Sequence, residues 1–443
     1  MQQAQDNILI SGERAASLYE KTPRERYVAY GDRTFLHALA ENKLYQTPTE
    51  LWITNSAHAR AILRHAGVEE AFVKGDGSDF ERFRFFCTVM GDMVGNSLKL
   101  QCHTALRELF DCPLVLNETN CEEIWRAVCE KLTRADLTPR EYAKKCGVDT
   151  LLVPLSPWEA LDDFARVDAP RTLPVFAPDA YFLPSGKEFA AAVRALDGEV
   201  GDFKSFCRAL LASLDRFAES GCRVARQSVL PVAFWRPNEY HAALYFEKAM
   251  AGEMLAPKEL SLYQAQLWRM LSEGYAARDM TLELCVGETP EKAEISHTVS
   301  GDFSVKAARD LFDYLKERVG LPRVAVYTEQ TALIPTVAAW AARYPAIREG
   351  EPQIALGVWQ GAPTETRAQL RALASVAPLS ACVGVLPDAR LPLSPWEPTL
   401  FHRALCCELA AWEQHGEIAA GEENLCRVIQ WATGENMRKY YKL

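Results

Sequence analysis

The sequence lacks long apolar runs, paired cysteine motifs and internal repeats, and each absence excludes a class of protein. No stretch reaches 18 consecutive apolar residues, so no transmembrane helix is predicted. The 13 cysteines never stand in C-x-x-C spacing, which argues against a zinc ribbon or finger and favours reduced, buried thiols. The absence of repeats and Gly/Ser linkers argues against a repeat array or a tethered domain.

The chain also has no excess of basic residues. Its 49 Lys and Arg stand against 59 Asp and Glu, which gives a formal net charge of −10. This balance argues against nucleic acid or an anionic membrane as a partner. The N-terminal stretch has no basic-then-apolar order typical of a signal peptide, so we expect a cytoplasmic protein.

What the sequence does contain is a regular alternation of short apolar strands and amphipathic helices. Most candidate strands are continuous apolar runs, as expected for parallel strands covered on both faces. Helical periodicity between them is clearest at 203–219, 259–278, 305–318 and 366–374. This pattern predicts a (β/α)8 barrel, an α/β fold of the TIM type. The eight candidate strands are 27–30, 150–155, 173–178, 222–229, 281–287, 323–328, 354–358 and 381–385.

The exception to this alternation is the segment 31–149, which has strong helix signals and little strand. We therefore expect a helical insertion after strand one and a helical C-terminal extension. The predicted organisation is an N-terminal segment with strand one at 1–30, the insertion at 31–149, the rest of the barrel at 150–397, and C-terminal helices at 398–443.

Chemistry in such a barrel takes place at the C-terminal ends of the strands. None of the eight histidines falls on a predicted strand end, although His58 and His103 could be brought over the barrel mouth by the insertion. Asp388 follows the last strand directly, with Arg390 two residues later. This position suits a general base or a metal ligand. A structural Asp–Arg pair that caps the last strand is the alternative.

Several motif-like stretches are spread over most of the chain: ELWI at 50–53, AGV at 66–68, GDGSDFERF at 75–83, GNSLKLQCHTALRELF at 95–110, EEIW at 122–125, LDRFAESGCRV at 214–224, AGEML at 251–255, LPRVAVY at 321–327 and VGVLPDAR at 383–390. Together, and in this order, they resemble the uronate (glucuronate) isomerase family. The resemblance implies a barrel of the amidohydrolase superfamily that binds a divalent metal such as zinc and interconverts hexuronates with their keto forms.

The metal signatures of that family are missing from this chain. The family's Asp-x-His-x-His falls on 30–34, which contains no histidine, and its later histidines fall on Gln227 and Cys285. Because each lost imidazole removes a bond to the metal, we expect no metal-binding residue and no cofactor. The resemblance leaves Asp388 as the catalytic residue, and as substrate-binding residues Arg390, Trp359, His58 and His103.

Two functions stay open from the sequence. The first is a uronate isomerase that acts on D-glucuronate or D-galacturonate, with Asp388 as the base and Arg390 as its partner. The second is a barrel without catalysis that binds a sugar acid or serves as a partner subunit, either in a homo-oligomer or beside a catalytic paralogue. In both, Arg33 or Arg226 could place a positive charge where the metal would be and pair with Asp388.

Overall fold

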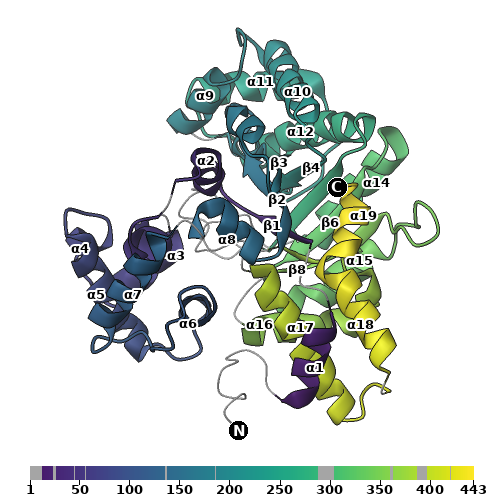
Figure 1. The fold of residues 1–443 in the computed structure, drawn as a ribbon. Coiled ribbons are helices and arrows are strands. Elements are labelled where there is room, and N and C mark those ends of the chain that lie inside the picture. The colour runs from purple at the N-terminus through teal and green to yellow at the C-terminus, as the bar shows by residue number, and fades with distance from the viewer. Residues whose placement is uncertain are drawn as a thin grey trace.

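The protein was analysed as a computed structural model. It describes residues 12–22, 26–43, 45–54, 56–134, 137–184, 186–287, 304–359, 363–386, 397–419 and 421–443. The core is a curled parallel sheet surrounded by helices (Figure 1). Its strands are β1 Tyr27–Tyr30, β2 Val148–Leu155, β3 Arg171–Phe176, β4 Val224–Gln227, β5 Thr281–Val286, β6 Arg323–Thr328, β7 Ile354–Leu356, β8 Val358–Trp359 and β9 Val385–Leu386.

The strands follow one another in chain order, as a (β/α)8 barrel requires. β1 to β7 form one parallel sheet, and β8 pairs in parallel with β9. β8 continues β7 after Gly357, so the two are one barrel strand that changes neighbours. Each of the eight strands predicted from the sequence overlaps a strand of the structure, and the predicted fold class is confirmed.

Gly357, at the junction of β7 and β8, is required by close packing inside the barrel. A Cβ built on this residue would lie 2.0 Å from the ring of Tyr327. The backbone N–H of Gly357 still donates to the carbonyl of Val326 on β6, at 3.0 Å. A glycine therefore lets the strand keep its ladder while a buried tyrosine fills the space beside it.

Side chains alternate between two buried layers along each strand. Ala29 and Leu151 face outward and pack with the surrounding helices. Tyr30, Leu152 and Cys285 face inward and belong to a separate cluster inside the barrel. The continuous apolar runs in the sequence result from this burial on both faces.

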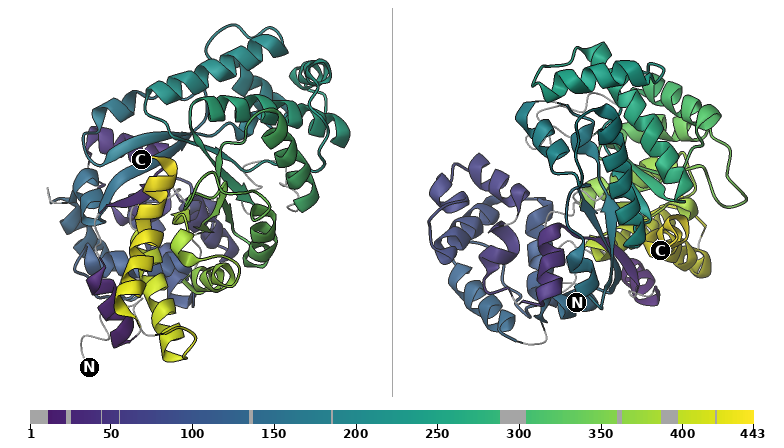
Figure 2. Two further views of the ribbon diagram at one scale, coloured as in Figure 1. Left: turned by 90° about the vertical axis from the view of Figure 1, so that its right-hand side faces the viewer. Right: turned by 90° about the horizontal axis from the view of Figure 1, so that it is seen from above.

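Helices cover the outside of the sheet, and a separate group forms a lobe to one side of it (Figures 1 and 2). The lobe lies between β1 and β2 in the chain, where the sequence predicts a helical insertion. The helices between β1 and β2 are α2 Arg33–Glu41, α3 Ala57–His65, α4 Glu70–Val73, α5 Asp79–Asp92, α6 Ser97–Glu108, α7 Cys121–Leu132 and α8 Pro139–Lys145.

The remaining helices include two whose bounds agree fully with the prediction, α10 and α14. None of the described helices is both long and apolar enough to cross a membrane. The helices outside the insertion are α1 Glu13–Lys21, α9 Gly186–Arg194, α10 Phe203–Glu219, α11 Glu239–Met250, α12 Pro257–Ala277, α14 Val305–Arg318, α15 Ile334–Ala341, α16 Pro363–Ala374, α17 Glu397–Gln414, α18 Glu422–Gln430 and α19 Asn436–Tyr441.

The last helix, α19, closes the N-terminal end of the barrel. Met437, Tyr440 and Tyr441 belong to the cluster of inward-facing strand residues. The hydroxyl of Tyr441 lies 2.8 Å from that of Tyr327 on β6. The C-terminal extension therefore supplies the floor of the barrel, and any ligand has to enter at the opposite end.

The insertion is attached to the barrel's helical shell by an ion pair. Arg403 on α17 pairs with Glu108 on α6, and its guanidinium carbon lies 5.2 Å from the ring centroid of Tyr19. Only 3% of the Arg403 side chain is exposed. A buried charge with a partner on the insertion fixes the two regions against each other, in agreement with the absence of a flexible linker in the sequence.

Candidate functional site

A buried polar centre lies inside the barrel where β1, β4 and β5 come together. The carboxylate of Glu283 on β5 is fully buried and accepts a hydrogen bond from the hydroxyl of Tyr30 on β1. Its other oxygen lies 2.8 Å from Nε of Arg226 on β4. The strand register explains this pair, because Arg226 is directly opposite Glu283 in the β4–β5 ladder.

The Arg226 guanidinium is held on two sides. Besides the bond to Glu283, its central carbon lies 4.6 Å from the centroid of the Tyr30 ring, within the range of a cation–π contact. Tyr30 therefore contacts both members of the ion pair: its hydroxyl holds Glu283 and its ring face holds Arg226. We call Tyr30, Arg226 and Glu283 the Arg226 centre.

Electrostatics keep Arg226 and Tyr30 in fixed protonation states. Burial is the largest single influence on Arg226 and would lower its pKa, but the interactions with Glu283, Cys285 and Tyr30 together outweigh burial and raise that pKa. Burial, and then the charge of Glu283, raise the pKa of Tyr30 well above its usual value. Arg226 is thus a permanent cation, and Tyr30 remains a protonated donor.

Two polar groups at this end of β4 are buried without a partner. Among the described residues, the Nη2 atom of Arg226 has no hydrogen-bond acceptor, and the side-chain amide of Gln227 has no hydrogen-bond partner. Because Val224 packs inside the barrel and Ala225 packs outside it, Arg226 faces inward and Gln227 outward. Only the unpaired Arg226 nitrogen therefore belongs to the barrel interior.

The structure places the residues predicted for substrate binding at separate positions. Trp359 belongs to the interior cluster at the end of β8, and its backbone N–H donates to Gln369 Oε1 at 2.9 Å. His58 lies on α3 in the insertion. Asp388 and Arg390, the predicted catalytic residue and its partner, fall outside the described residues.

His103 on α6 has a structural contact. Its Nε2 accepts a hydrogen bond from the backbone N–H of Leu116 at 2.9 Å. Burial lowers the pKa of His103 to about 4, with further lowering by the nearby charges of Lys99 and Arg107. The ring is therefore neutral at physiological pH and holds the 109–120 segment against α6.

Charged residues at other strand ends are engaged locally. Asp32 accepts a hydrogen bond from the N–H of Phe35 at 2.7 Å and caps α2, as Ser, Thr, Asp and Asn commonly do at helix starts. Arg33, one of the two arginines expected to replace the metal, pairs with Glu159 at 3.0 Å and has half its side chain exposed. Arg226 is therefore the arginine in the barrel interior, and its partner among the described residues is Glu283, whereas Asp388 lies outside those residues.

Comparison with known proteins agrees with this architecture. A family model described as glucuronate isomerase matches residues 1–441. The chain belongs to the glucuronate isomerase family. The family resemblance inferred from the sequence is thereby confirmed over nearly the whole chain.

Individual glucuronate isomerase relatives are distant but match the chain along its length. The uronate isomerase of Oceanobacillus iheyensis is 25% identical, with 98% of this chain and 97% of that protein covered. The uronate isomerase of Halalkalibacterium halodurans is 26% identical, with 91% and 90% covered.

Two solved structures have a similar fold over nearly the whole chain. The uronate isomerase structure from Thermotoga maritima superposes with a TM-score of 0.87 at 20% identity, with 98% of this chain and 99% of that chain covered. The glucuronate isomerase structure from Caulobacter crescentus superposes with a TM-score of 0.82 at 16% identity, with 98% of this chain and 96% of that chain covered. At these identities the likeness establishes the shared fold alone.

The metal that the glucuronate isomerase resemblance implies does not fit the side chains described at the strand ends. Within the described ranges, no three His, Cys, Asp or Glu side chains converge as a possible metal site. The strand ends instead present Asp32 as a helix cap, the cation of Arg226, and Cys285. A guanidinium cannot donate to a metal ion, because it has no free lone pair at neutral pH.

Tyr30 and Glu283 were not predicted as site residues from the sequence. The sequence contains a signal for Glu283, which is the single carboxylate in the apolar run TLELCV. Its side chain has to face either the barrel interior or the surrounding helices, and because both exclude water the carboxylate needs a partner. The run VARQ has one cation in the same situation. Lone opposite charges in two consecutive buried strands predict an ion pair between them.

Proposed function

We propose that this member of the glucuronate isomerase family binds a hexuronate at the C-terminal mouth of its barrel and does not isomerise it. The observation that carries the proposal is the Arg226 centre, a preformed ion pair inside the barrel on β4 and β5, the strands that carry Gln227 and Cys285 where the family resemblance places histidines. The relatives are named uronate isomerases, which supports a uronate as the ligand.

The absence of turnover follows from the chemistry of the reaction. Aldose–ketose isomerisation moves a proton from C2 to C1 of the open-chain sugar, and negative charge develops on the carbonyl oxygen. Removing one preorganised group that stabilises such charge typically slows a reaction by about a hundred- to a thousandfold. The loss of several imidazole ligands together would place the rate below detection, although effects of residues that act as a unit do not simply multiply.

A coupled assay on D-glucuronate and D-galacturonate tests this proposal, with zinc, manganese or cobalt supplied in turn. We expect no turnover above the background rate. The matched control is Asp388→Asn, which removes the proposed base. Clear activity in the parent that disappears in the variant contradicts the proposal and establishes an isomerase that uses Asp388.

A second measurement concerns the metal directly. Protein purified without added metal should contain far less than one divalent ion per chain by plasma emission spectroscopy. The physical reason is the donor set at the strand ends, which lacks histidine. Near-stoichiometric zinc or manganese that resists dialysis would show that ligands outside the described residues form a metal site.

Metal-free isomerisation is a second candidate, favoured by one observation. The Arg226 side chain keeps 17% of its surface exposed although Glu283 beside it is fully buried, so the cation is accessible to a ligand. A guanidinium hydrogen-bonded to the carbonyl oxygen would stabilise developing charge without metal. The coupled assay separates the two candidates, because only this one predicts activity in metal-free buffer that Asp388→Asn abolishes.

A further inference from the structure

We propose that the unpaired edge of the Arg226 guanidinium is a carboxylate subsite at the centre of the barrel. In this arrangement the acid group of a sugar acid points down the barrel axis and its hydroxylated carbons face the mouth. The inference rests on the proposed uronate-binding function and adds which group of the ligand is recognised, by which residue, and therefore which sugars bind.

The first support is the preorganisation of Arg226. Glu283 holds its Nε at 2.8 Å and the Tyr30 ring supports its face, with 4.6 Å between the guanidinium carbon and the ring centroid. An arginine normally loses considerable side-chain freedom when it binds a ligand. Here that entropy is lost on folding, so a ligand that contacts the remaining nitrogens meets a rigid planar donor.

The second support is the unsatisfied hydrogen-bonding capacity of that side chain. Its Nη2 is buried and has no acceptor in the part of the chain that the structure describes. A buried donor without a partner is unfavourable and uncommon in native proteins, and it calls for an explanation. Because Glu283 uses Nε, the two terminal nitrogens are left to form the pair of parallel bonds that arginine makes with a carboxylate.

The third support is the direction from which a ligand can approach. Met437, Tyr440 and Tyr441 of α19 fill the N-terminal end of the barrel. The exposed 17% of the Arg226 side chain consequently faces the C-terminal mouth. A carboxylate can reach the guanidinium from that side only.

Charge decides the class of ligand. A neutral hydroxyl or carbonyl can accept a hydrogen bond from the free edge, but a carboxylate can accept two parallel bonds in which both partners are charged, and such bonds are stronger. Sugar acids, both uronates and aldonates, should therefore bind, and neutral hexoses of the same size should not.

Titration calorimetry on the full chain tests the inference with D-glucuronate, D-gluconate and D-glucose. The two acids should bind and glucose should show no heat above dilution. Arg226→Lys keeps the positive charge but cannot form the pair of parallel hydrogen bonds. It should weaken D-glucuronate binding about 10- to 100-fold, the range expected for charged hydrogen bonds. Gln227→Leu, one residue along β4 and facing outward, is the matched control and should leave the affinity unchanged.

Because Arg226→Lys retains a cation, a second variant removes the whole pair. Arg226→Met combined with Glu283→Leu replaces it by apolar residues of similar volume, a change that folded proteins often tolerate. This double variant should unfold cooperatively and bind neither acid. Binding of D-glucuronate at parental affinity by the folded double variant, or equal binding of D-glucose by the parent, overturns the inference.

The outcomes for the two proposals can be separated. Turnover by the parent chain contradicts the inactive function but leaves the carboxylate subsite standing if the Arg226 variants still lose affinity. Unchanged affinity in the Arg226 variants contradicts the subsite while leaving a uronate-binding function intact. A parent chain that binds neither acid contradicts both.

Discussion

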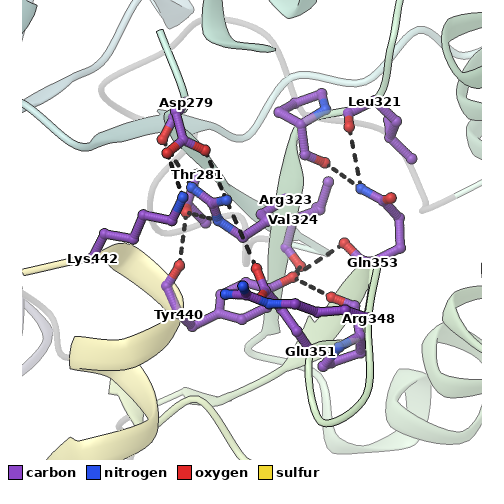
Figure 3. Close-up of polar contacts among 12 residues, drawn as sticks. Asp279, Thr281, Leu321, Arg323, Val324, Arg348, Glu351, Gln353, Tyr440 and Lys442 are labelled. Carbon is purple, nitrogen blue, oxygen red and sulfur yellow. Dashed lines mark hydrogen bonds and ion pairs between the residues drawn. The ribbon is translucent and has the colours of Figure 1, made fainter. Parts of the chain in front are cut away.

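The N-terminal end of the barrel and the barrel interior each hold a buried arginine, but the two side chains differ in how completely they are paired. At the N-terminal end Arg323, the first residue of β6, is 8% exposed and contacts Asp279, Thr281 and Glu351 (Figure 3). In the interior, Arg226 is also largely buried, but one of its nitrogens has no partner among the described residues.

The C-terminal segment adds further contacts at the N-terminal end. The Tyr440 hydroxyl lies 3.0 Å from the carbonyl oxygens of Val324 and Pro352, and Lys442 pairs with Asp279 (Figure 3). Because Asp279 pairs with both Arg323 and Lys442, the charges at this end hold the chain terminus in place. Under the proposal above, the unpaired nitrogen of Arg226 serves ligand binding instead.

The largest expected effect comes from breaking the Arg226–Glu283 ion pair in the barrel interior. Arg226→Ala leaves Glu283 buried without its counter-charge, so it should lower the free energy of unfolding by about 3–5 kcal/mol. Urea unfolding followed by circular dichroism measures this change. The double variant Arg226→Ala with Glu283→Leu should recover most of the lost stability. If this double variant is as unstable as Arg226→Ala alone, the Arg226 side chain stabilises the protein mainly by packing.

A smaller effect is expected at the floor. Tyr440→Phe removes a hydroxyl that bonds to strand carbonyls, so it should cost about 1–2 kcal/mol, the range for one buried hydrogen bond. The affinity for D-glucuronate should not change, because the contact lies at the end opposite the mouth. Lower affinity together with unchanged stability would contradict the division between the two ends.

Gln227→Leu should have a still smaller effect and of the opposite sign. Both amide atoms of Gln227 are buried without partners, so replacing the amide by an apolar group removes a desolvation penalty. We expect the free energy of unfolding to stay the same or rise by up to about 1 kcal/mol. A loss of more than that in urea unfolding would mean that the amide has a partner, such as a buried water.

The sequence predicted the frame of this comparison but not its details. Strands buried on both faces are continuous apolar runs, so their positions can be found locally, and all eight were. The pairing of Arg226 with Glu283 joins residues 57 positions apart, and only the barrel register brings them together. Arg226 was predicted as a substitute for the metal, but the lone charge of Glu283 in the next strand, which could have identified its partner, was not used.

The role of α19 in closing the N-terminal end of the barrel was not predicted from the sequence, for a related reason. The C-terminal helices were predicted, but nothing in their periodicity indicates that Tyr440 and Tyr441 enter the barrel. Helical spacing shows which face is apolar and not which surface it covers. The predictions for Asp388, Arg390, Trp359, His58 and His103 remain predictions that only ligand binding and mutagenesis can test.

The smallest expected effect is a dependence of the floor on acidity. Asp279 pairs with Arg323 and Lys442, and these contacts outweigh its partial burial, so the pKa of Asp279 lies below its model-compound value of 3.8. A carboxyl whose pKa is lowered by folding stabilises the folded state above its unfolded pKa. That contribution is lost as the pH falls below 3.8 toward the folded value. Asp279 is well exposed, so solvent screening keeps the contribution small.

Hydrogen exchange should therefore show the α19 amides losing protection in this acidic range before the β4 and β5 amides do. In Asp279→Asn the α19 amides should be less protected already at neutral pH and should change less with acid. Equal acid sensitivity of α19 in parent and variant would place the titrating group elsewhere.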